Sequence, residues 1–380
     1  MENMNKNIKC YDLFAFYGMH SGFNIGMLNL INEVYYSEFN SIEFYSEGVL
    51  NKIVKNELNK GNISYYELPK LNNPVIGGYN TLLRDLKACL YVPKIFKSNA
   101  TDVYIFLAYP FTTLLIHLFS FFSKKKIYLV LHGEMEVFVK NSTFTRNKKY
   151  YSLTRFIYKK SKINFILLGE TIYNSLDFLF LKKPIVLNLP KKMEDPVLFE
   201  SKTINRLSII MIGVADKNKG TESFIQIANE FSKEVEEGIL SFEIVGKISE
   251  DMKVLCGNNV IYHSELIPYE LYNEKIRKSD LALLLKDNTV KATASGTFLD
   301  AISYGVPFFS IKNDYIEYYC TNYLKDNCIF DTVSDMVKKI NDLLIMNKND
   351  RKDFLIHCQN DILELRTKFT VSANRQFINI

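Results

Sequence analysis

Residues 208–220 read SIIMIGVADKNKG, and this stretch decides the fold. A short apolar run ends at Gly213, a polar loop follows, and Lys219 and Gly220 open a helix-length segment. A continuous apolar run of this length predicts a strand buried on both faces, as in parallel sheets. A glycine there lets the backbone approach a ligand, and a lysine beside a helix N-terminus can reach a phosphate. The alternative is a tight strand-to-helix turn with a solvated lysine.

The same alternation of apolar runs and helix-length segments extends along the whole chain, which predicts an α/β fold of two doubly wound halves. We predict an N-terminal Rossmann-like domain at 1–190, a linker at 191–206, and a second Rossmann-like domain at 207–355. A helical segment at 356–380 would follow and pack back on the first domain. The strands are predicted at 11–16, 42–46, 103–108, 127–131, 163–168, 184–189, 207–213, 241–246, 259–263, 280–285 and 306–311.

The composition is that of a globular protein, with 47% hydrophobic and 23% charged residues among 380. The N-terminal residues do not resemble a secretory leader, and no apolar stretch is long enough to span a membrane. Six scattered cysteines form no CxxC pair, so we expect reduced thiols, no zinc site and a cytoplasmic location.

The charge is unevenly divided between the two halves. Residues 1–195 contain 25 Lys and Arg against 16 Asp and Glu, whereas residues 196–380 contain 22 against 26. A basic half suggests contact with an anionic partner or surface, although such a composition can also simply solvate the surface. We expect no nucleic-acid partner.

A second motif lies at residues 291–307, KATASGTFLDAISYGVP. Ser295, Gly296 and Thr297 are typical of a helix start, where backbone amides can hold a diphosphate. Asp300 would then accept hydrogen bonds from ribose or sugar hydroxyls. Alternatively, Thr297 and Asp300 form a capping pair that satisfies the helix's own amides.

Together the two motifs resemble the GT-B superfamily, most closely glycosyltransferase family four. The matching elements are Gly213 with Lys219-Gly220, the glycine of SFEIVG at Gly246, and the second motif at 295–307. The resemblance implies two Rossmann-like domains whose parallel sheets face each other across a cleft, with the donor in the second. It also implies transfer of a sugar from a nucleoside diphosphate, with retention of configuration.

The sequence departs from the family at two positions. The family's phosphate-binding arginine would fall at Val214, and its paired glutamates at Thr293 and Asp300. Three other cations could replace the arginine: Lys217, Lys247 and Lys291.

In the first half, residues 17–31 contain Gly18, His20 and Gly22 near a probable helix start, where the resemblance implies an acceptor-side loop. A flexible turn is the alternative. His132 follows the apolar run 127–131, where the resemblance implies contact with the transferred sugar. It could hydrogen-bond the sugar or take the acceptor proton, or merely end the strand. If configuration is inverted, His132 or Glu134 becomes the candidate base.

Residues 111–126, FTTLLIHLFSFFSKKK, allow two interpretations. We expect a helix buried between strands, with its lysines in the following turn. The alternative is a helix resting on an anionic membrane, which would place the protein peripherally at the inner membrane face.

The sequence therefore predicts a glycosyltransferase in surface polysaccharide synthesis, with a glycan or lipid-linked glycan acceptor. We expect no cofactor and no metal, because no Asp-x-Asp pair occurs. The catalytic candidates are His132, Lys219 and Asp300. The alternatives are a non-catalytic binding subunit, favoured by Val214, and a nucleotide-sugar epimerase.

Overall fold

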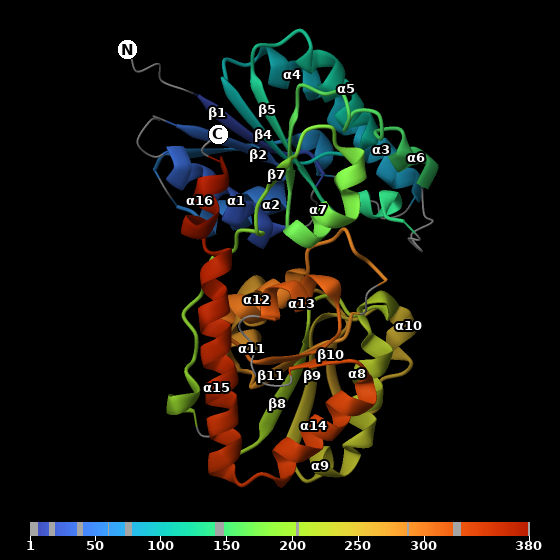
Figure 1. The fold of residues 1–380 in the computed structure, drawn as a ribbon, viewed down its shortest axis with the longest axis vertical. Helices are drawn as coiled ribbons and strands as arrows, with labels where there is room; N and C mark the ends of the chain where they lie inside the picture. The colour runs from blue at the N-terminus through green and yellow to red at the C-terminus, as the bar shows by residue number, and fades with distance from the viewer. Residues whose placement is uncertain are drawn as a thin grey trace. The chain divides into compact units, whose positions relative to one another are not determined.

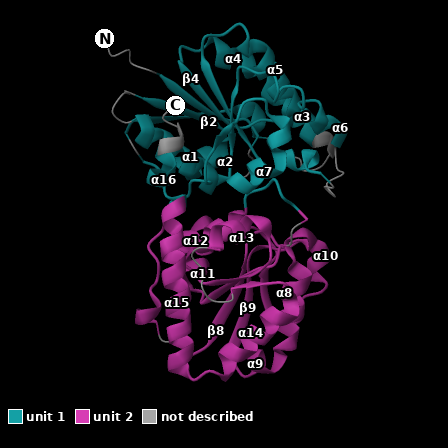
Figure 2. Cartoon of the chain, viewed as in Figure 1, with its two compact units in different colours: residues 1–192, 290–294, 369–380 teal, residues 193–289, 295–368 magenta. Residues whose placement is uncertain are grey.

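The computed structural model describes residues 7–14, 20–35, 41–59, 61–72, 78–140, 148–202, 205–286, 289–321 and 328–378. The chain forms two compact units (Figures 1 and 2). Unit 1 contains residues 1–192, 290–294 and 369–380, and unit 2 contains residues 193–289 and 295–368.

Unit 1 is built on a seven-stranded sheet in the order β3-β2-β1-β4-β5-β6-β7, with every neighbouring pair parallel. Its strands are β1 (Ile8–Asp12), β2 (Ile42–Ser46), β3 (Ile63–Glu67), β4 (Asp102–Leu107), β5 (Lys126–Leu131), β6 (Asn164–Leu167) and β7 (Ile185–Val186). Its helices are α1 (Ser21–Tyr35), α2 (Gly48–Glu57), α3 (Gly78–Cys89), α4 (Val92–Lys97), α5 (Pro110–Ser120), α6 (Lys148–Ser152), α7 (Glu170–Leu176) and α16 (Val371–Ile378). The central strand β4 is buried along its whole length, as its apolar sequence predicts.

Unit 2 is built on a six-stranded parallel sheet in the order β10-β9-β8-β11-β12-β13. Its strands are β8 (Leu207–Ile212), β9 (Leu240–Lys247), β10 (Val260–His263), β11 (Leu281–Leu284), β12 (Phe308–Ile311) and β13 (Ile329–Phe330). Its helices are α8 (Thr221–Glu230), α9 (Ser232–Glu236), α10 (Glu250–Lys253), α11 (Tyr269–Lys278), α12 (Gly296–Tyr304), α13 (Asp314–Cys320), α14 (Val333–Ile345) and α15 (Lys348–Arg366).

In both sheets the strand order reverses beside the first strand, which is the topology of Rossmann-like domains. In such sheets, ligands bind outside the carboxyl ends of the strands at the point of reversal. That point lies between β1 and β4 in unit 1, and between β8 and β11 in unit 2. The predicted α/β class with two Rossmann-like domains is confirmed.

The structure differs from the predicted boundaries in several places. The first strand begins at Ile8 rather than residue 11, and our predicted strands omitted β3 and β13. Residues 193–206, which we predicted as linker, belong to unit 2, where Phe199 is buried in the core. Of the predicted C-terminal segment, residues 356–368 belong to unit 2 and residues 369–380 to unit 1, where α16 packs on α1.

Candidate functional site

Two glycines touch each other at the carboxyl edge of the unit 2 sheet. Gly213 directly follows β8, and Gly246 lies near the end of the neighbouring strand β9. Both have a positive φ, 87° and 153°. A Cβ at Gly246 would lie 2.0 Å from the carbonyl oxygen of Gly213, so no larger residue fits there. Because neither residue has a side chain, the two glycines place only backbone atoms at this edge of the sheet, beside β8.

Lys219 and Gly220 form the turn into α8, as predicted. Gly220 adopts a left-handed conformation with a φ of 76°, and a Cβ there would lie 2.5 Å from the carbonyl oxygen of Leu285, just past β11. Burial lowers the pKa of the Lys219 ammonium, while the negative charges of Asp216 and Asp300 oppose that shift. The structure thus brings Lys219 close enough to Asp300 for their charges to interact, at the point where the strand order reverses.

The loop before α12 lies against Gly213. The Thr297 methyl group is 3.3 Å from the position that a Cβ of Gly213 would take, and the hydroxyls of Ser295 and Thr297 are 3.3 Å apart. Ser295 is the N-cap of α12, because its hydroxyl accepts a hydrogen bond from the Phe298 amide. The predicted helix start is therefore found at Gly296, but the capping residue is Ser295 rather than Thr297. The other first-turn amides of α12 are the donors that an anion at this loop would meet.

Asp300 has a partner that the sequence did not reveal. Its Oδ2 atom accepts a hydrogen bond of 2.7 Å from the hydroxyl of Tyr272, which lies on α11. Burial and the charge of Asp300 both raise the pKa of Tyr272, so this hydroxyl stays protonated and donates. A second unpredicted group is Asp216, whose Oδ1 atom is buried with no hydrogen-bond partner among the described residues. Tyr272 belongs to no recognisable motif, and Asp216 lies inside the 208–220 stretch at a position for which the spacing of Gly213 and Lys219 specifies no residue.

Residues 290–294 belong to unit 1, although the chain on either side belongs to unit 2. The Glu136 carboxylate accepts hydrogen bonds from the backbone amides of Lys291 and Ala292, at 2.9 and 2.6 Å. The Thr293 hydroxyl oxygen lies 2.9 Å from the position that a Cβ of Gly133 would take. Thr293 is therefore a neighbour of Gly133 within unit 1.

Val214 occupies the position at which the resemblance would place a phosphate-binding arginine, and its side chain is 48% exposed. Of the predicted substitutes, the exposed Lys217 has its ammonium 3.8 Å from the Glu222 carboxylate, and the half-buried Lys247 has its ammonium 3.5 Å from the Glu265 carboxylate. Lys291 has an exposed side chain and belongs to unit 1. Lys219 is the more buried cation beside the α12 loop.

In unit 1, His132 directly follows β5 at the carboxyl edge. Its Nε2 atom lies 2.7 Å from the carbonyl oxygen of Phe106, and because a carbonyl only accepts, Nε2 carries the proton and donates. Burial is the main reason that the His132 pKa falls to about 3, and the nearby His20 lowers it further. His132 is therefore neutral near pH 7, and its Nδ1 atom presents a lone pair.

Glu134 lies beside His132 and is also titratable. Its Oε1 atom accepts a hydrogen bond of 2.9 Å from the His132 amide, yet burial raises its pKa to about 7. A carboxyl group with this pKa exchanges its proton near neutral pH.

The predicted acceptor-side loop contributes two described residues, His20 and Gly22, to the carboxyl edge of the unit 1 sheet. The His20 ring stacks on His132 with ring centres 5.5 Å apart, and its φ of 65° is unusual for a residue other than glycine. Gly22 is the second residue of α1, where a Cβ would lie 2.8 Å from the Lys191 ammonium. Gly18 lies outside the described residues. Asn24 joins this region to β1 by donating to the carboxylate of Asp12 at 2.9 Å.

Two negative findings concern only the described residues. Within them, no three His, Cys, Asp or Glu side chains are grouped to hold a metal ion. Likewise, none of their helices is both long enough and apolar enough to cross a membrane.

Comparison with known proteins identifies the architecture. A sucrose-phosphate synthase from Thermosynechococcus elongatus superposes with a TM-score of 0.67 at 10% identity, covering 98% of this chain and 97% of that one. The Anabaena protein HepE in complex with UDP-glucose gives 0.64 at 12% identity, covering 97% of each chain. This chain has the GT-B fold. A Listeria monocytogenes protein described provisionally as a UDP-N-acetylglucosamine 2-epimerase gives 0.57 at 14% identity, covering 98% and 94%, so the fold does not by itself distinguish transfer from epimerisation.

Sequence comparison gives one curated relative, an uncharacterised glycosyltransferase of Methanocaldococcus jannaschii. It is 25% identical over an alignment of 265 positions, and the alignment covers 64% of this chain and 65% of the relative. The chain thus spans about two thirds of that relative's length. No protein-family model matches the chain.

Proposed function

We propose that this GT-B-fold chain is a glycosyltransferase resembling family four, which moves a sugar from a nucleoside diphosphate to a hydroxyl of a glycan or lipid-linked glycan. The observation behind the proposal is the cluster of Lys219, Asp300 and the α12 loop at the reversal point of the unit 2 sheet. The curated relative is named a glycosyltransferase, and a structural neighbour is in complex with UDP-glucose, which supports this choice. Surface polysaccharide synthesis is the setting we propose.

The donor's diphosphate would lie between the Lys219 ammonium and the first-turn amides of α12. Negative charge grows on the diphosphate as the sugar leaves, and fixed donors stabilise it without reorganising. Asp300, held by Tyr272, would accept hydrogen bonds from ribose or sugar hydroxyls. The resemblance favours retention of configuration, a site without metal and no cofactor.

His132 would bind the transferred sugar rather than take a proton. Its Nδ1 lone pair can accept a hydrogen bond from a hydroxyl, but a pKa of about 3 makes it a weak base. If the reaction inverts configuration, Glu134 is the better candidate base because its pKa is about 7. Measuring the anomeric configuration of the first product by NMR decides between the two routes.

Nucleotide binding is the first test. Thermal unfolding is measured with UDP, GDP, ADP and CMP for the wild type, Lys219→Ala and Asp300→Ala, with the exposed Lys233→Ala as matched control. A ligand that binds only the folded state at a hundredfold excess over Kd stabilises it by about 2.7 kcal/mol. We expect one nucleotide to raise the unfolding temperature of the wild type. The increase should be smaller in both site variants and unchanged in the control. Equal shifts in all four proteins would move the binding site elsewhere.

The competing function is a non-catalytic binding subunit, which the exposed Val214 favours because a valine cannot pair with phosphate. Incubating the purified chain with a labelled sugar nucleotide and acceptor separates the two functions. Sugar transfer by the chain alone excludes the subunit, whereas nucleotide binding without turnover favours it. Release of an epimerised sugar nucleotide without any acceptor would instead indicate an epimerase.

We also include in the proposal a cytoplasmic location with peripheral association at the inner membrane face. The acceptor would then be presented at the lipid surface, which suits a lipid-linked glycan. The α5 region that suggested this is partly buried and partly exposed: Ile116 and His117 are buried, whereas Leu118 and Phe122 are exposed.

A further inference from the structure

Six apolar side chains form an exposed surface at the end of α5 and in the turns after α6. We refer to it as the outer apolar patch, and it comprises Leu118, Phe119, Phe121, Phe122, Leu153 and Phe156. Phe122 is 93% exposed, which is unusual for a side chain that gains so much free energy on burial. Phe119, Phe121 and Phe156 are each more than a third exposed as well.

Contacts within unit 1 show that the patch is continuous. The ring of His117 packs against both Phe121 and Phe156, with centroid separations of 4.8 and 5.9 Å. Phe119 packs on Phe96 of the neighbouring helix α4 at 5.4 Å. The two segments that supply the patch are far apart in sequence but meet at His117.

The segment that supplies the patch carries mainly positive charge. Residues 86–169 contain 14 Lys and Arg but only three acidic residues, which are Asp102, Glu134 and Glu136. Asp102 and Glu136 are buried, and Glu134 has the raised pKa of a carboxyl group shielded from water. Every exposed charge that the structure describes over this range is therefore positive.

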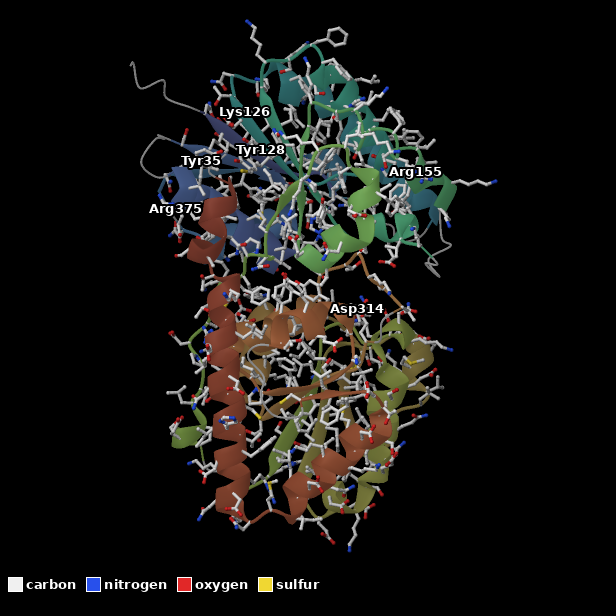
Figure 3. The ribbon with its side chains drawn as sticks, viewed as in Figure 1. Tyr35, Lys126, Tyr128, Arg155, Asp314 and Arg375 are labelled. Atoms are coloured by element: carbon white, nitrogen blue, oxygen red, sulfur yellow. The ribbon has the colours of Figure 1, made fainter. Side chains whose placement is uncertain are left out.

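Several of these cations lie directly beside the patch. The Lys162 ammonium is 5.9 Å from the Phe121 ring centre, and it donates a hydrogen bond to the Phe121 carbonyl. Lys124, Lys159 and Lys160 are exposed in the turns that supply the patch. Arg155, also exposed, is labelled at the right-hand edge of unit 1 in Figure 3.

From this pairing of exposed aromatic side chains with exposed lysines in the same segments, we infer that the outer apolar patch inserts into the interface of an anionic lipid bilayer. Apolar side chains at such an interface gain free energy by leaving water, while lysines are attracted to acidic headgroups. The inference assigns a surface to the membrane association included in the proposed function. It does not depend on sugar transfer, so vesicle binding tests it separately from catalysis.

The chain contains no tryptophan, which allows a site-specific fluorescent probe. Phe122→Trp is titrated with phosphatidylcholine vesicles and with vesicles containing phosphatidylglycerol. The matched control is Ile345→Trp, since Ile345 is 83% exposed in unit 2. We expect a blue shift of emission for Phe122→Trp with the anionic vesicles and none for the control. The absence of a shift at Phe122→Trp, or an equal shift at both positions, overturns the inference.

Co-sedimentation with the same vesicles separates the apolar and charge contributions. Lys159→Gln combined with Lys160→Gln should weaken anionic-vesicle binding by about fivefold per lysine, whereas Lys233→Gln combined with Lys338→Gln in unit 2 should not. Phe121→Ser combined with Phe122→Ser should weaken binding by roughly tenfold or more. Equal binding to both vesicle types refutes the role of the charges. If the patch instead mediates self-association that Phe122→Ser abolishes, and no vesicle binds, the partner is protein rather than lipid.

Discussion

The half-buried Glu134 gives the protein a pH dependence that can be worked out in advance. Its carboxyl pKa is raised from 4.5 to about 7 by burial. Below about pH 4.5 the folded and unfolded states both hold the proton, so the group has no effect on stability. As pH rises from 4.5 to 7 the unfolded state ionises first, and the folded state loses about 3 kcal/mol relative to it.

His132 acts in the opposite direction over a neighbouring range. Its pKa is lowered from 6.5 to about 3, so the unfolded state binds the extra proton between these values and stability rises with pH there. The two effects partly cancel between pH 4.5 and 6.5, so the wild-type profile alone does not reveal either. The stability difference between the wild type and Glu134→Gln isolates the contribution of the carboxyl group. The glutamine oxygen can still accept the hydrogen bond from the His132 amide.

We therefore expect Glu134→Gln to match the wild type near pH 4.5 and to be more stable at pH 8, by up to about 3 kcal/mol. The assay is urea unfolding from pH 4.5 to 8, with the transitions of the two units fitted separately. Glu270→Gln, at an exposed position in unit 2, is the control and should give a constant offset. A stability difference for Glu134→Gln that does not change with pH would refute the burial argument.

Three further predictions rest on single contacts. Gly246→Ala should destabilise unit 2 by about 3 kcal/mol or more, because the added Cβ would lie 2.0 Å from the Gly213 carbonyl oxygen. The control is Gly257→Ala, where a Cβ meets open space and stability should change by less than about 0.5 kcal/mol. Gly26→Ala should destabilise unit 1 to a similar degree, since its Cβ would lie 1.9 Å from the Pro190 carbonyl oxygen; calorimetry of both variants checks these values. Tyr272→Phe should weaken binding of the preferred sugar nucleotide by roughly tenfold by freeing Asp300, as measured by titration calorimetry, and an unchanged Kd would contradict a positioning role.

The fold was predictable because its signals are local. Apolar runs such as 207–213 and 280–285 are strands in both prediction and structure, since strands buried on both faces exclude polar residues. The strand β3 escaped prediction because four of its five residues, all but Ile63, are not fully buried. The two-residue strand β13 is too short for any pattern.

The candidate site was only partly predictable, for a physical reason. Glycines and a lysine at strand ends follow from backbone geometry, so Gly213, Gly246 and Lys219 could be found from sequence. Tyr272 reaches Asp300 from a separate helix, and such a contact has no sequence spacing to detect it. The grouping of Thr293 with Gly133 in unit 1 is likewise a tertiary contact, whereas the family resemblance paired Thr293 with Asp300.

In the proposed donor site, Val214 stands where the family that the chain resembles has an arginine, so Lys219 is the cation that we propose for the diphosphate. This ammonium is kept from water, which would favour its neutral form, but the carboxylates of Asp216 and Asp300 favour the charged form. A diphosphate arriving at the α12 amides would add more negative charge on the same side and hold the ammonium protonated. Donor binding should therefore be coupled to the protonation of one lysine, and binding should take up protons as pH approaches the lowered pKa of Lys219. Titration calorimetry in buffers of different ionisation enthalpy measures that uptake, and its absence in Lys219→Met but not in Lys217→Met would assign it to Lys219.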